Sequence, residues 1–99
     1  MTIDKTLNGN ELYISLHGSL DTITSPDLEE VIRKELKEVK LLTIDLKDVD
    51  YVSSAGLRVF LLAEKTMDNQ DGKLVVLNAA KEIMDVFELT GFSNVLDIR

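Results

Sequence analysis

The chain has 99 residues, of which 44% are hydrophobic and none is cysteine, and its formal net charge is −7. This length and apolar content predict one domain, residues 1–99, that closes its core without disulfides or thiolate metal sites. The acidic charge argues against nucleic-acid binding, which requires clusters of Lys and Arg. No window approaches the ~18 apolar residues of a membrane span. We therefore expect a cytoplasmic protein with neither a nucleic-acid nor a membrane partner.

The first half of the chain predicts a hairpin followed by a helix. Strands are expected at residues 3–7 and 12–16, because apolar and polar residues alternate in the second and turn-forming residues occupy positions 8–10. Ser25 then supplies an expected helix N-cap and Pro26 the first helical residue, before apolar residues at helical spacing.

The second half alternates strands with helices. Apolar runs predict strands at residues 41–46 and 74–77, with a helix between them that begins near Ser54. A third helix is expected to end at Gly91, and residues 95–98 to form an edge strand. The order β-β-α-β-α-β-α-(β) predicts an α/β fold, a small mixed sheet in which an N-terminal hairpin joins parallel strands with helical crossovers.

Functional residues are expected in two loops that follow predicted strands, residues 17–22 and 47–54. In parallel sheets, sites lie beyond the carboxyl ends of strands, where loops lead into helices. The two strands are expected to be neighbours. The second loop ends in Ser53 and Ser54, where the N–H groups of a helix N-terminus suit either a capping oxygen or a phosphate.

An ordinary helix cap is the simpler interpretation of these serines, and Ser54 is expected to face outward in either case. Gly56 favours the other interpretation. Early in a helix Gly costs about 0.5–1 kcal/mol relative to Ala, which suggests that a phosphate or a partner surface approaches the backbone closely.

The helix after Ser54 carries more apolar residues than one buried stripe needs. A core stripe is expected from Val59 to Met67, and Leu57 and Leu61 lie off it. They either belong to a partner surface or flank a wide core stripe. We expect Leu57 to belong to the partner surface more than to the core.

Three enzymatic chemistries lack their motifs. A serine hydrolase would need glycine at Val52 and an imidazole base, but the single histidine, His17, follows a strand and has no recognisable partner. No phosphate-cradling glycine motif is present, so no nucleotide cofactor is expected. Four carboxylates lack calcium-loop spacing, namely Asp21, Asp45, Asp48 and Asp50. We expect no metal, no cofactor and no enzymatic activity.

Residues 48–58, taken with Gly18-Ser19-Leu20-Asp21 and the element order, resemble bacterial anti-sigma factor antagonists of the STAS family. The resemblance covers nearly the whole chain. In that family the loop reads Asp-Ser-Ser-Gly-Leu or Asp-Ser-Ala-Gly-Leu, and its first serine is phosphorylated. The matching serine is Ser54, with Ser53 where the family often has Asp. Asp21 matches an acidic residue that the family has beside the phosphorylated serine.

The resemblance implies regulation of sigma-dependent transcription by partner switching. The unphosphorylated protein binds an anti-sigma factor with ATP-dependent serine kinase activity, phosphorylation of Ser54 releases it, and a serine phosphatase reactivates it. The alternative is a constitutive STAS scaffold or transporter-regulatory subunit in which Ser54 merely caps a helix. The expected partner-binding residues are Asp21, Thr22, Ser53, Ala55, Gly56, Leu57, Arg58 and Leu61.

Overall fold

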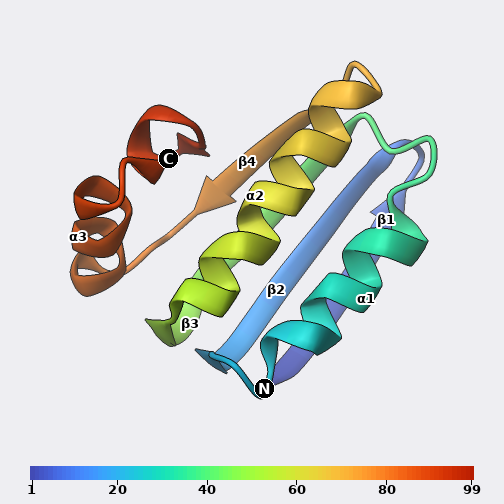
Figure 1. Ribbon diagram of the computed structural model, residues 1–99. Helices are drawn as coiled ribbons and strands as arrows, with labels where there is room; N and C mark the ends of the chain where they lie inside the picture. The colour runs from blue at the N-terminus through green and yellow to red at the C-terminus, as the bar shows by residue number, and fades with distance from the viewer.

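The computed structural model describes residues 1–99 as one five-stranded sheet with three α-helices and a short 3-10 helix (Figure 1). The element order is the predicted one. The elements are β1 Thr2–Asn8, β2 Glu11–Leu20, α1 Ser25–Glu35, β3 Leu41–Val52, α2 Ser54–Asn69, β4 Lys73–Leu77, α3 Lys81–Leu89, the 3-10 helix Phe92–Asn94 and β5 Asp97–Ile98.

The sheet is mixed, as predicted. Its strands follow the order β1-β2-β3-β4-β5, with β1 antiparallel to β2 and every other neighbouring pair parallel. The expected hairpin turn at residues 8–10 connects β1 to β2. The strands that precede the two candidate loops, β2 and β3, are direct neighbours.

β2 and β3 are longer than the sequence predicted, and most of the two expected loops is strand. The two strands remain paired up to Leu20 and Val52, with register shifts between Ser15 and His17 and between Gly18 and Ser19. These irregularities interrupt the strict alternation by which a strand is recognised in a sequence. Only Ser53 separates β3 from α2, and a four-residue turn at 21–24 leads from β2 into α1.

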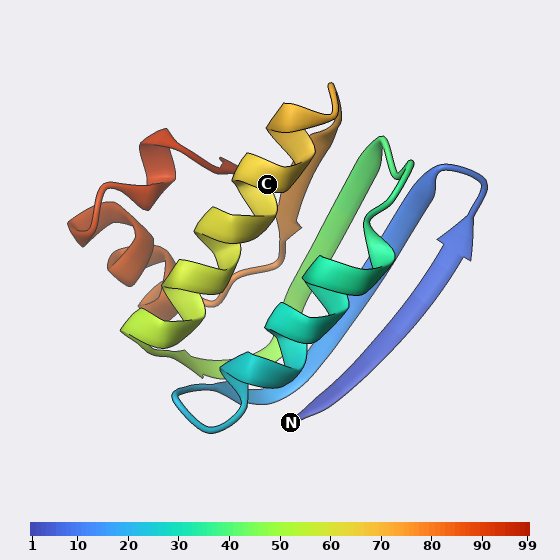
Figure 2. The ribbon, with the colours of Figure 1, turned by 45° about the vertical axis from the view of Figure 1, so that its right-hand side comes forward.

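One face of the sheet carries the core. α1 and α2 lie side by side on this face, and α3 lies beyond α2 (Figures 1 and 2). The predicted stripe of α2 is buried, and the ring of Phe60 meets Phe87 of α3 edge-on, with centroids 5.8 Å apart. Burial of such side chains from both sheet and helices is the main favourable term in folding.

The helix boundaries differ slightly from expectation. α1 is preceded by Thr24 as its N-cap, so Ser25 is the first helical residue and not the cap. α3 ends before Gly91, as predicted, and this glycine takes a left-handed conformation with φ 82°. Each of the three helices is too short or too polar to cross a membrane.

Candidate functional site

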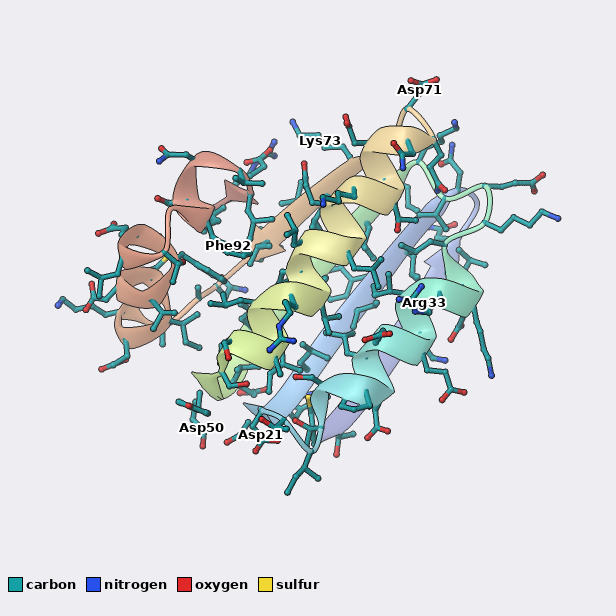
Figure 3. All side chains as sticks on the ribbon, in the orientation of Figure 1. Asp21, Arg33, Asp50, Asp71, Lys73 and Phe92 are labelled. Carbon is teal, nitrogen blue, oxygen red and sulfur yellow. The ribbon has the colours of Figure 1, made fainter.

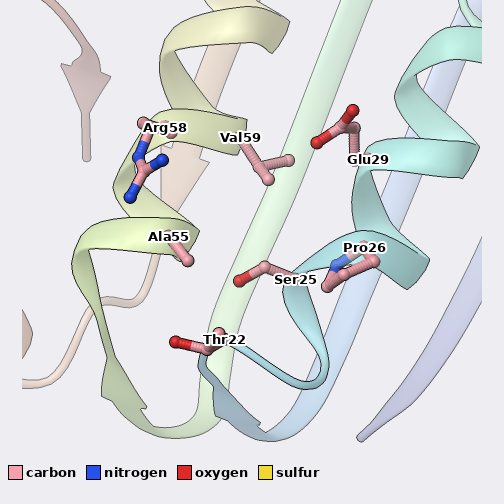
Figure 4. Close-up of a pocket in the computed structure, with 7 residues that line it drawn as sticks. All are labelled: Thr22, Ser25, Pro26, Glu29, Ala55, Arg58 and Val59. Atoms are coloured by element: carbon pink, nitrogen blue, oxygen red, sulfur yellow. The ribbon is translucent and has the colours of Figure 1, made fainter.

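Two helix N-termini meet at the carboxyl edge of the central parallel strands. The final pair of β2 and β3 is Leu20 with Val52, and the backbone N–H of Ser53 donates to the carbonyl of Leu20 at 2.9 Å. α1 begins after the turn from β2, and α2 begins directly after Ser53. The close-up in Figure 4 shows the first turns of both helices facing a common hollow.

The two adjacent serines have different structural roles. Ser53 is the N-cap of α2, and its hydroxyl accepts a long hydrogen bond of 3.5 Å from the N–H of Gly56. Ser54 is the first helical residue, its side chain is exposed, and its hydroxyl makes no hydrogen bond within the chain. The first turn of α2 contains no acidic residue, so the positive end of the helix dipole meets no carboxylate within that turn.

Gly56 is required by the chain's own packing. A Cβ atom at this position would lie 2.9 Å from the side chain of Leu20 and 3.1 Å from its carbonyl oxygen. Within the chain, the neighbour that approaches the backbone at Gly56 is therefore the end of β2. The approach of a phosphate or a partner surface stays a prediction. Close packing of α2 against β2 explains why glycine is needed in the first turn.

The prediction that Leu57 belongs to the partner surface is wrong. Its side chain is 7% exposed and is part of the main hydrophobic cluster. Leu57 lies one turn before Phe60 and belongs to the same hydrophobic cluster, so the buried face of α2 is wider than the predicted stripe. The second interpretation, a wide core stripe, holds for Leu57, whereas Leu61 is half-buried.

Asp21 organises the turn that leads into α1. Its Oδ1 accepts hydrogen bonds from the N–H groups of Ile23 and Thr24, at 2.9 and 3.0 Å. The hydroxyl of Thr24 in turn donates to the carbonyl of Ser19 at 2.7 Å. The N–H of Thr24, followed by the N–H of Ile23, holds the pKa of Asp21 below its usual value. No local sequence motif indicates this role of Thr24.

The acidic residues do not all gather around Ser54. Asp21 and Asp50 lie at the same end of the molecule (Figure 3), and Asp50 accepts a hydrogen bond of 2.7 Å from the hydroxyl of Ser19. Asp48 instead lies beside His17, with 3.0 Å between its Oδ2 and the ring Nδ1. No group of three or more acidic or histidine side chains is arranged to hold a metal ion.

Two of the expected partner-binding residues meet α1 across a hollow. Ala55 and Arg58 of α2 line it together with Thr22 and residues of the first turns of α1 (Figure 4). Ser25 and Glu29, which sequence reasoning did not associate with α2, complete this hollow. Helical periodicity identifies the faces of α1 and α2 separately, but only their packing side by side brings these residues together.

Comparison with known proteins identifies the family. A model of the STAS domain matches residues 2–99. An anti-sigma-B factor antagonist of Bacillus subtilis is 31% identical over 98 residues, covering 99% of this chain and 90% of the relative.

Solved structures agree on the fold. An anti-sigma factor antagonist from Mycobacterium paratuberculosis superposes with a TM-score of 0.86 at 22% identity, covering 98% of this chain and 83% of that one. The Bacillus protein SpoIIAA in its phosphorylated form superposes with a TM-score of 0.70 at 16% identity, covering 99% and 91%. The full-length sequence match and the shared fold together establish that this chain belongs to the STAS-domain family of anti-sigma factor antagonists.

Proposed function

We propose that this protein binds an anti-sigma factor when Ser54 is unphosphorylated and is released when that partner, acting as an ATP-dependent kinase, phosphorylates Ser54. A serine phosphatase restores binding. The observation that carries the proposal is the separation of roles in the first turn of α2. Ser53 caps the helix. The hydroxyl of Ser54 is exposed, makes no hydrogen bond within the chain and is accessible to a kinase.

The charge added by a phosphate on Ser54 is expected to weaken partner binding more than it destabilises the fold. Phosphorylation adds about −1.5 to −2 charges at the end of the molecule that carries Asp21 and Asp50. The dipole of α2 stabilises a negative group at its N-terminus by about 0.3–1 kcal/mol. Arg58, one helical turn after Ser54 and without an ion pair, is a further local counter-charge. The phosphorylated protein is therefore expected to stay folded.

A partner packed against this turn would be affected strongly. Like charges brought together at an interface cost several kcal/mol, and each ~1.4 kcal/mol corresponds to a tenfold loss of affinity. The exposed and half-buried residues of the two turns form the proposed contact surface, namely Asp21, Thr22, Ser53, Ser54, Ala55 and Arg58. Gly56 and Leu57 support this surface from within.

The site of modification is tested by incubating the protein with its cognate kinase and ATP and locating the phosphate by mass spectrometry. We expect phosphate on Ser54 in the wild type and in Ser53→Ala, and none in Ser54→Ala. Phosphate found on Ser53, or on neither serine with a kinase known to bind the chain, would contradict the proposal.

Binding is tested by calorimetric titration of the anti-sigma factor. We expect Ser54→Asp to weaken binding at least about tenfold, roughly 1.4 kcal/mol, and Ser54→Ala to bind like the wild type. Asn94→Asp is a matched control, because it adds the same charge at an exposed position in the 3-10 helix. Equal affinities for all four proteins would favour a constitutive scaffold over a switch.

A further inference from the structure

A groove runs between α1 and α2, beginning at their N-termini, and the proposed switch leaves most of it unused. Its first hollow has a volume of about 140 Å³ and is the one drawn in Figure 4. A second hollow, of about 290 Å³, continues along the helices towards Arg33 and Lys65. Glu29 and Arg58 line both hollows, so the two form one continuous groove.

The charge of this groove is opposite to that of the whole chain. The protein has 18 acidic residues against 11 Lys and Arg. Along the groove, however, three cations face a single carboxylate, that of Glu29. The Nε of Arg33 lies 2.9 Å from this carboxylate and neutralises it. Arg58 and Lys65 form no ion pair, so the groove retains two exposed cations available to a partner.

A buried hydroxyl points into the same groove. Ser25 is only 2% exposed, and its Oγ has no hydrogen-bond partner. Figure 4 shows this oxygen directed towards α2, on the side of the hollow opposite Ala55 and Arg58. Buried side-chain polar atoms are nearly always hydrogen-bonded. A carboxylate that entered the hollow would pair with the guanidinium of Arg58 and, after rotation of the Ser25 side chain, accept a hydrogen bond from its hydroxyl.

The floor and dimensions of the groove suit a peptide segment. Val59 is buried, and Leu61 and Leu62 present half-buried apolar surface. Two hollows in a row along the helices fit successive side chains of one extended or helical segment.

We infer that the groove between α1 and α2 is a docking site for an acidic, leucine-containing segment of a protein partner. One carboxylate of the segment lies between Arg58 and the hydroxyl of Ser25, a second lies near Lys65, and an apolar side chain packs on Leu61 and Leu62. This docking site shares Thr22, Ala55 and Arg58 with the contact surface proposed above and extends along the helices beyond it.

The test uses a blocked hexapeptide of sequence Glu-Leu-Glu-Glu-Leu-Glu, titrated into the ¹⁵N-labelled full chain. We expect saturable shifts of backbone amide signals at Ser25, Arg58, Leu61 and Lys65, with a dissociation constant of about 1 mM or tighter. A peptide with Gln in place of every Glu is expected to cause no saturable shift. Shifts spread over the whole surface, or none, would overturn the inference.

Matched variants identify the groups responsible. Arg58→Gln is expected to weaken peptide binding at least about tenfold, because it removes a charge-assisted pair. Lys37→Gln removes the same charge at an exposed residue outside the groove and is expected to leave binding unchanged. Equal losses in the two variants would show non-specific attraction and overturn the docking site. The titration uses the unphosphorylated chain without a kinase, so its failure is distinguishable from failure of the proposed switch, which the phosphate mapping and the anti-sigma titration test.

Discussion

The turn into α1 and the turn into α2 are built from the same parts, yet they expose their serines differently. Each follows a strand of the central parallel pair, and each places a serine at the first helical position after a hydroxyl-bearing N-cap residue, Thr24 or Ser53. Ser25 is 2% exposed, whereas Ser54 is exposed. Position in the helix is therefore no guide to whether a kinase can reach a serine.

The direction of each serine around its helix explains the difference. Ser25 lies seven residues before Ile32, two helical turns away, and both point into the buried side of α1. Ser54 lies two residues before Gly56, whose backbone packs on Leu20, so Ser54 is turned well away from that contact. The inward contacts of α2 thus leave Ser54 at the surface.

The largest effect is expected from the residue that anchors the turn into α2. Leu57→Ala should lower the free energy of unfolding by about 2–5 kcal/mol, because it leaves a cavity in the core. Arg58→Ala, the next residue but exposed, should change it by less than about 0.5 kcal/mol. Urea unfolding measures both. Similarly small losses of unfolding free energy in the two variants would mean that Leu57 does not stabilise the turn into α2.

A smaller effect should separate the two serines of α2. Ser53→Ala is expected to cost about 0.5–1 kcal/mol, the lower part of the range for N-caps, because its hydrogen bond to Gly56 is long at 3.5 Å. Ser54→Ala should alter stability by less than about 0.5 kcal/mol. The urea midpoints of the two variants are compared with that of the wild type. A larger loss of stability in Ser54→Ala than in Ser53→Ala would mean that Ser54 is the cap.

The smallest effect concerns the turn into α1 and depends on pH. The pKa of Asp21 is lowered by hydrogen bonds to its charged form, so this carboxylate stabilises the fold above its unfolded pKa of about 3.8. That contribution is lost as the pH falls through the lower pKa of the folded state. Asp21→Asn should therefore be less stable than the wild type at pH 7, and the difference should vanish in strongly acidic solution. Thermal unfolding at several pH values checks this, and a difference independent of pH would count against it.

Sequence reasoning was accurate where a feature depends on nearby residues. The hairpin turn at 8–10, the stripe from Val59 to Met67 and the termination of α3 by Gly91 were all predictable from periodicity and turn chemistry. It failed for the ends of β2 and β3, where register shifts disturb alternation. It also failed for Leu57, because the helical periodicity of α2 alone does not show how wide a face of the helix the rest of the fold buries.

The sequence by itself determined the order of elements, the mixed sheet and the presence of a serine pair at the start of α2, because capping and periodicity act over a few residues. Only the tertiary structure decided which serines are exposed, why position 56 must be glycine and where the cationic groove lies. Each of these depends on β2 and β3 being neighbours and on α1 and α2 packing side by side. Contacts between segments 31 to 33 residues apart in the chain leave no periodic signal in the sequence.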